Sequence, residues 1–132
     1  MATIKRFEDL EVWQMARALA KDIYQITQQQ NFLHEFRLKE QVKSSSGSVM
    51  DNIAEGFGRG SRLEFVQFLS IAKGSADELK SQLYRMHDYN LITEVGFKIH
   101  YEQADILGAK IFSFMDYLNK TKHKGIKFKD RE

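Results

Sequence analysis

The sequence predicts an all-α protein that folds as an antiparallel up-down-up-down four-helix bundle. Four stretches of the chain repeat apolar residues at spacings of three and four, which places those residues on one face of a helix. The 132 residues include no proline, so long helices can run uninterrupted. The connections between the stretches are short, and short connections make successive helices antiparallel neighbours. We expect one bundle domain over residues 1–119 and a basic tail over residues 120–132.

The first helix is expected from about Glu8 to Gln28. Its apolar stripe consists of Val12, Ala16, Leu19, Ile23 and Ile26. The polar run that follows predicts a loop to roughly Glu35, in which Phe32 turns back onto the bundle.

The second helix has to pass through a serine–glycine run, Ser44–Ser48. Alone, such a run is typical of a flexible linker. However, Leu38 and Val42 before it keep the same helical phase as Val49 and Ile53 after it. We therefore expect one continuous helix, whose small residues let a neighbouring helix approach closely.

A glycine-rich corner joins the second helix to the third. Gly56, Gly58 and Gly60 are expected to end the second helix by adopting positive φ. Ser61 and Glu64 have the spacing of a capping box, which starts the third helix.

The third helix is expected from Ser61 to about Tyr89 or Asn90, and the fourth from an N-cap at Thr93 to near Asn119. Gly74 lies inside the third helix, where glycine costs about 1 kcal/mol relative to alanine, so we expect it to mark a close contact between helices and not a break. Some apolar residues of the first and third helices lie outside a narrow stripe, which predicts a second apolar face that binds a partner. These residues include Trp13, Tyr24, Phe65 and Ile71.

The corner also carries a resemblance to a known family. The segment from Asn52 to Arg59, Asn-Ile-Ala-Glu-Gly-Phe-Gly-Arg, resembles the signature of the bacterial "four helix bundle" family, also called S23 or 23S rRNA intervening-sequence proteins. The segments Phe7–Gln14 and Ile71–Leu79 resemble the same family, so the resemblance covers about residues 6–118. It implies a homopentameric ring with a central channel, no enzymatic activity, and a relation to the accessory protein of diversity-generating retroelements.

The charge of the chain is concentrated at its carboxyl end. The net charge is +2, yet residues 120–132 carry +4, so the remaining residues sum to −2. The basic residues of the tail are Lys120, Lys122, Lys124, Lys127, Lys129 and Arg131. Ile126 and Phe128 alternate with lysines, a pattern that could stack an aromatic ring on a base while lysines meet phosphates. A merely solvated tail is the alternative.

The polar residues and the glycines of the corner could serve either the fold or a functional site. Asn52, Glu55 and Arg59 have helical spacing, which favours a structural polar network over a catalytic carboxylate. The glycines lack the lysine and serine of a P-loop, so a nucleotide site is disfavoured. The exposed amides at the start of the third helix, flanked by Arg59 and Arg62, could still bind one phosphate of a nucleic acid.

The sequence predicts no metal, cofactor or catalytic residue. No histidine has an acidic residue three positions before it, the chain has no cysteine, and no spacing selects a carboxylate site from Glu55, Glu78 and Glu102. The N-terminus lacks an apolar signal region and no long apolar run occurs, so we expect a cytoplasmic protein without a membrane span.

These observations together predict a non-enzymatic, oligomeric binding module for structured RNA or an RNA–protein complex. Phosphate contacts would come from Arg59, Arg62, Lys120, Lys122, Lys124, Lys127 and Lys129. The alternative is a structural or protein-interaction ring that binds a protein partner and no nucleic acid.

Overall fold

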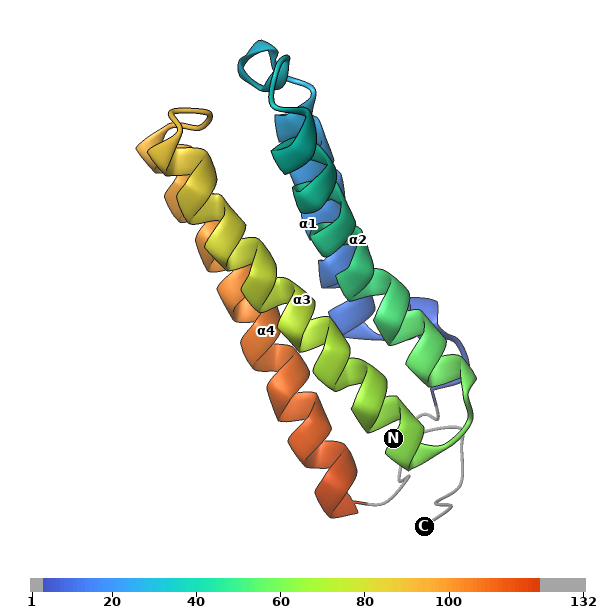
Figure 1. Ribbon diagram of the computed structural model, residues 1–132. Helices are drawn as coiled ribbons and strands as arrows, with labels where there is room; N and C mark the ends of the chain where they lie inside the picture. Colours follow the sequence, from blue (N-terminus) through green and yellow to red (C-terminus); the bar gives the residue numbers. More distant parts are fainter. Residues whose placement is uncertain (1–3, 122–132) are drawn as a thin grey trace.

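The computed structural model describes residues 4–121 and contains the four predicted helices (Figure 1). They are α1 (Glu11–Thr27), α2 (Phe36–Gly58), α3 (Arg62–Asp88) and α4 (Glu94–Thr121), with short 3-10 helices η1 (Phe7–Asp9) and η2 (Gln30–Phe32). No β-strand occurs between residues 4 and 121. The all-α prediction is confirmed.

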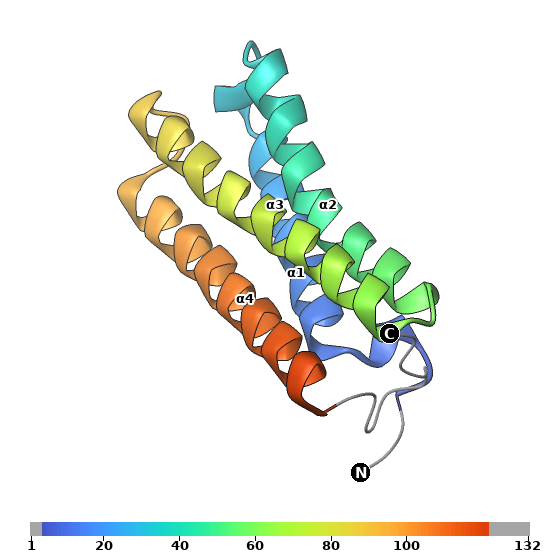
Figure 2. The same cartoon turned by 60° about the horizontal axis from the view of Figure 1, so that its bottom comes forward.

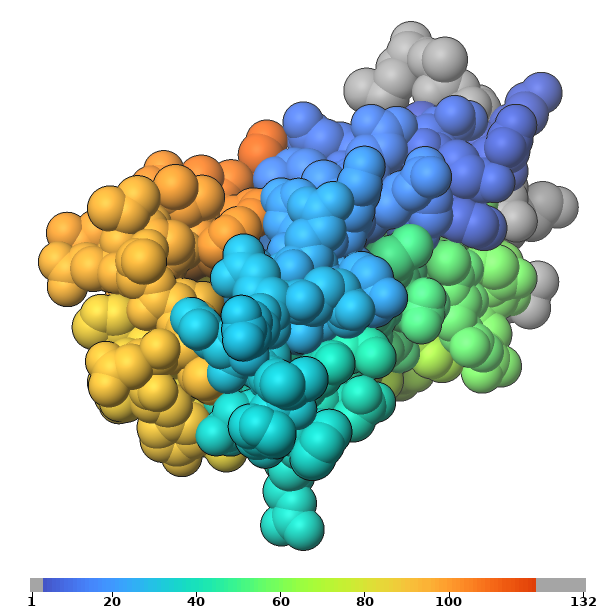
Figure 3. All heavy atoms as spheres, turned by 90° about the horizontal axis from the view of Figure 1, so that it is seen from above, coloured from blue at the N-terminus to red at the C-terminus, as the bar shows by residue number. Residues whose placement is uncertain are grey.

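Each helix packs against the next, and α4 returns to α1, so the helices occupy four corners of an antiparallel bundle. The α1–α2 and α3–α4 connections lie at one end, which we call the connection end. The two connections are neighbours there (Figure 3), and Asn31 Nδ2 donates to the Leu91 carbonyl at 3.4 Å. The opposite end, which we call the corner end, holds the α2–α3 turn and the end of α4 (Figure 2).

The bundle encloses one apolar core along its whole length. Its largest fully buried side chains are Leu19, Ile23, Phe32, Ile53, Phe65, Leu69, Leu79, Leu83, Met86, Leu107, Ile111 and Leu118. Phe32 is fully buried although it lies in the α1–α2 connection, as predicted. Within the described residues, no helix is long and apolar enough to cross a membrane.

The first helix begins later than predicted, at Glu11 and not Glu8. Leu10 is extended, with φ −76° and ψ 127°, and separates η1 from α1. This break lets Leu10 enter the core at 5% exposure, while Phe7 folds back so that its ring lies 5.1 Å from that of Trp13. Burial of these side chains outweighs continuation of the helix.

The prediction that α2 continues through Ser44–Ser48 is confirmed. Ser45 and Ser46 are buried, and the Ser45 hydroxyl donates to Gln82 Oε1 of α3 at 2.6 Å. The Ser75 hydroxyl of α3 lies 3.0 Å from that of Ser48. The small residues thus let α2 and α3 approach closely and hydrogen-bond side chain to side chain.

The predicted roles of three glycines are wrong. Of the three corner glycines, Gly60 has the predicted positive φ, at 74°. Gly56 and Gly58 do not end the second helix, because both are part of α2. Gly56 is buried against α3, so its role is close packing. Gly74 marks no close contact within the chain, because an added Cβ would meet no atom within 4 Å.

The connection between α3 and α4 follows the prediction. Asn90 has φ 62°, a left-handed conformation that ends α3. The Thr93 hydroxyl then accepts the amide of Gly96 at 3.0 Å and caps α4.

The predicted second apolar face is partly correct. Tyr24 and Ile71 are about half exposed, at 51% and 52%. Phe65, in contrast, is fully buried and contacts the rings of Phe57 and Phe114. Trp13 packs partly buried against the core.

Candidate nucleic-acid interface

The α2–α3 corner holds the exposed cation predicted to bind phosphate, Arg59. Gly60 turns the chain, and the Ser61 hydroxyl accepts the amide of Glu64 at 3.4 Å, which caps α3. The Arg59 guanidinium lies 3.2 Å from Glu55 Oε2 and 5.0 Å from the centre of the Phe68 ring. Its side chain is 48% exposed, so Arg59 could exchange Glu55 for a phosphate at the surface.

Arg62 is placed differently from the prediction. It is only 3% exposed, and its Nη1 donates to Asn119 Oδ1 at 3.2 Å. A buried guanidinium that already binds a neighbouring helix is a poor surface contact for phosphate. Its position indicates a structural role in tying the start of α3 to the end of α4.

The three residues predicted as one polar network fall into two groups. Glu55 and Arg59 form the ion pair just described. Asn52 instead donates to the carbonyl and to the hydroxyl of Ser48, both at 2.8 Å. Since Ser48 also contacts Ser75, Asn52 belongs to the polar contact between α2 and α3.

The root of the basic tail lies at the corner end. Lys120, in the last turn of α4, is highly exposed and pairs with Asp116 at 2.9 Å. The Arg62–Asn119 hydrogen bond joins this turn to the α2–α3 corner. The other predicted phosphate contacts, Lys122, Lys124, Lys127 and Lys129, lie outside the described residues.

A further ion pair lies at the start of η1. Arg6 Nη2 lies 3.0 Å from Glu8 Oε2, and this hydrogen bond lowers the pKa of the Glu8 carboxyl and raises that of the Arg6 guanidinium. Arg6, Arg59 and Lys120 therefore each pair with a nearby acid. Any phosphate would have to compete with these local carboxylates, and the pairs are exposed enough to open.

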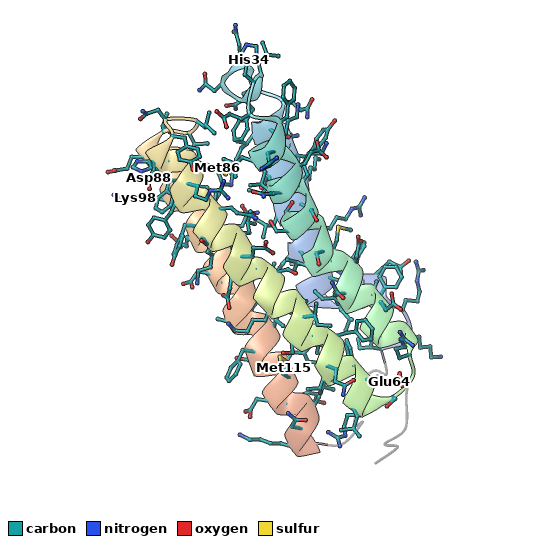
Figure 4. The ribbon with its side chains drawn as sticks, in the orientation of Figure 1. His34, Glu64, Met86, Asp88, Lys98 and Met115 are labelled. Carbon is teal, nitrogen blue, oxygen red and sulfur yellow. The ribbon has the colours of Figure 1, made fainter. Side chains whose placement is uncertain are left out.

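The described residues hold no group of three or more histidines and acids arranged for a metal ion. Glu55, Glu78 and Glu102 lie on three different helices. His34 lies in the α1–α2 connection and is labelled in Figure 4.

Two further histidines have a polar side chain close to the imidazole ring. His87 lies 3.8 Å from a Glu94 oxygen, and His100 Nδ1 lies 3.2 Å from Gln103 Oε1. His123 lies outside the described residues.

Sequence reasoning missed the polar contacts that set the spacing of α2 and α3. The buried Gln82 accepts from Ser45, and Gln41 accepts from Arg85 Nη1 at 3.1 Å. A signal was present, because Gln82 follows Leu79 at the three-residue spacing typical of the apolar stripe. A polar residue in such a position predicts a buried hydrogen bond.

Comparison with solved structures finds the same fold in a bacterial protein. The chain is similar to a protein of unknown function from the S23 ribosomal protein family of Bacteroides thetaiotaomicron, with 23% identity and a TM-score of 0.72. The similarity covers 79% of this chain and 97% of that one. At this identity it supports the fold alone.

Comparison with curated proteins finds no match. Comparison with protein families finds one described as 23S rRNA-intervening sequence protein, which matches residues 8–113 and so includes all of α1, α2 and α3 and most of α4. The chain therefore belongs to the 23S rRNA-intervening sequence protein family.

Proposed function

We propose that this protein is a cytoplasmic, non-enzymatic binding module that assembles into a ring of five and binds structured RNA. The observation that carries the proposal is the position of Lys120 in the last turn of α4. The chain leaves α4 next to the α2–α3 corner, so Lys120 and Arg59 share one end of the bundle. The exposed side chains of Lys120 and Arg59, together with the basic residues that follow Lys120 in the sequence, would supply cations for a phosphate backbone.

Assembly would multiply this surface. In a ring, equivalent ends of the subunits face the same side, so several tails would act on one RNA molecule. A second and third contact then form at a high effective concentration, and a weak single tail suffices. Because lysines read phosphates and not bases, the protein alone would show little sequence preference.

RNA affinity measured against salt concentration tests the proposal. A structured RNA hairpin would be titrated with the full chain, with a chain ending at Asn119, and with Arg59→Ala, each at known oligomeric mass. Arg37→Ala is the matched control, because Arg37 is an exposed arginine at the start of α2, close to the connection end. Circular dichroism would establish that the shortened chain keeps its helices.

We expect the full chain to bind with a steep salt dependence that flattens on truncation. Each phosphate contact contributes roughly 0.7 to 0.9 to the slope of log affinity against log salt, so loss of five lysines that all contact phosphate should reduce the slope by about 3.5 to 4.5. Arg59→Ala should weaken binding, and Arg37→Ala should not.

Binding no tighter than about micromolar at low salt, by the full chain and the shortened chain alike, would reject the RNA proposal. The alternative, a protein-interaction ring without nucleic-acid binding, would then account for the exposed apolar residues of the bundle.

A further inference from the structure

The outward side of α4 carries three large aliphatic residues that the bundle does not use. Val95, Ile99 and Ile106 are 68%, 58% and 43% exposed. We call these three residues the α4 ridge. Exposed aliphatic side chains in a row on one helix are characteristic of a contact with another chain.

Contacts on both flanks of α4 fix the direction of this ridge. On one flank, Gln103 donates to Asp22 of α1 at 3.1 Å, and Lys110 lies 3.3 Å from Glu11 of α1. On the other flank, Asp105 accepts from Lys80 of α3 at 2.7 Å. The ridge lies between these flanks and opposite the buried residues of α4, so it points away from the bundle.

The spacing of the ridge is that of a helix–helix seam. Val95, Ile99 and Ile106 follow one another by four and seven residues, and Glu102 occupies the intermediate heptad position. Apolar residues alternating at four and three positions form the contact line of a coiled coil. The ridge extends over about 16 Å of helix, enough for two to three turns of a partner helix.

The charged residues beside the ridge indicate which surface of another chain can bind it. The other acids beside the ridge are paired within the chain, Asp105 with Lys80 and Glu94 with Lys98. Glu102, in contrast, is exposed and has no ion-pair partner in the part of the chain that the structure describes. The ridge thus presents one available carboxylate in the middle of an apolar line.

The exposed side of α1 offers the complementary charges. This α1 outer face consists of Gln14, Arg17, Lys21 and Gln25, all exposed. Arg17 and Lys21 are four residues apart on the same side of the helix, and neither forms an ion pair with another residue of the range 4–121. The Arg17 guanidinium lies 5.8 Å from the centre of the Trp13 ring, and the Arg17 side chain is exposed.

We propose that the α4 ridge of one copy packs against the α1 outer face of the next copy, with Glu102 between Arg17 and Lys21. The long stems of Arg17, Lys21 and the glutamines cover the aliphatic residues, while their polar ends reach the rim. This assignment rests on the proposed self-association and names its interface. The two faces belong to different helices, so the contact is heterologous, and repeated heterologous contacts form a ring when their rotation closes.

Pairing of two α4 ridges with each other is less favourable. An antiparallel pair that sets Ile99 opposite Ile106 brings the two Glu102 carboxylates together near the two-fold axis. Like charges at that position oppose association. The heterologous contact gives the same carboxylate two cations.

Charge reversal tests the contact, with mass measured by light scattering over a range of protein concentrations. The variants are Glu102→Lys, the pair Arg17→Glu with Lys21→Glu, and all three changes together. Ile106→Glu tests the apolar part, and Asp51→Lys, which changes an exposed acid of α2 that belongs to neither face, is the matched control. All these positions are on the surface, so helicity should be unchanged.

We expect Glu102→Lys, the double reversal on α1 and Ile106→Glu each to raise the dissociation constant of the oligomer at least about tenfold, and the triple variant to recover most of the loss. Mixing Glu102→Lys with the α1 double variant should also restore association, because the interface is heterologous.

The outcomes separate this contact from self-association itself. A wild-type chain that stays monomeric at all concentrations overturns both. An oligomeric wild-type chain whose mass is unaffected by these reversals, or equally reduced by Asp51→Lys, overturns only the assigned interface and leaves the oligomer in place.

Discussion

Gly56 of α2 lies directly against Phe68 of α3. A Cβ atom at Gly56 would stand 2.5 Å from the Cβ of Phe68 and 3.1 Å from Cδ1 of Phe65. The Phe68 Cβ is fixed to its own helix backbone and cannot swing away, so the absence of a side chain at Gly56 sets the distance between α2 and α3 near the corner.

Gly56→Ala should therefore destabilise the protein. Overpacking of this kind costs about 1–3 kcal/mol, and the intrinsic preference of a helix for alanine, about 1 kcal/mol, offsets only part of it. Chemical denaturation measures the change. Gly74→Ala is the control, since that position is open within the chain, and it should stabilise by about 0.5–1 kcal/mol. Equal effects of the two changes would contradict the close approach at Gly56.

The Ser45–Gln82 hydrogen bond should behave as a coupled pair. Ser45→Ala leaves the buried Gln82 oxygen without its 2.6 Å donor and should cost about 1–3 kcal/mol. Replacing both residues, as Ser45→Ala with Gln82→Leu, removes the unsatisfied group and should cost less than the two single changes added together. Strict additivity in this double-mutant cycle would show that the bond contributes nothing specific.

The Lys80–Asp105 ion pair should make the free energy of unfolding depend on pH in the alkaline range. The hydrogen bond that Lys80 donates to Asp105 raises the pKa of Lys80 above its ordinary value, with burial acting in the opposite direction. A raised pKa in the folded state means that the pair stabilises the fold below the ordinary lysine pKa of about 10.4 and loses this contribution as pH rises through the folded value.

Asp105→Asn should consequently lower the free energy of unfolding at pH 7 by up to about 1 kcal/mol, a modest value because the carboxylate is more than half exposed. The difference from wild type should disappear in strongly alkaline solution. Denaturant titrations at neutral and alkaline pH make the comparison. A difference that persists unchanged above the folded pKa of Lys80 would assign it to another cause.

Substitution of Arg62 should affect mainly stability, whereas substitution of Arg59 should affect mainly RNA binding. Arg62→Met removes the hydrogen bond to Asn119 from a buried position and should destabilise the protein by about 1–3 kcal/mol, with hydrogen exchange rising in the last turn of α4. Arg59→Ala should change stability by less than about 1 kcal/mol, yet weaken RNA binding. The assignment fails if Arg62→Met leaves both stability and exchange at wild-type levels.

The sequence was sufficient to predict the four helices and their order because helical periodicity is a local property. The phase shared by Val42 and Val49 identified α2 as continuous despite four serines and a glycine between residues 44 and 48. Caps at Ser61 and Thr93 were also predictable, since a cap depends on residues three positions apart. Family membership followed from the corner motif and agrees with the family match.

The candidate site was predictable only in part, because burial depends on residues distant in sequence. Arg59 and Arg62 look equivalent in the chain, three residues apart beside a glycine corner. The structure leaves Arg59 at the surface and buries Arg62 against Asn119, which follows 57 residues later. No local pattern distinguishes the two arginines.

By itself, the sequence determined the four helices, the N-caps at Ser61 and Thr93, the antiparallel order and the basic tail, since each depends on spacing or on charge along the chain. Only the tertiary structure decided that Gly56 sets a helix distance while Gly74 does not, that Asn52 binds Ser48, and that Val95, Ile99 and Ile106 face outward. These features depend on which helix faces join, and packing energy between elements far apart in the chain makes that choice.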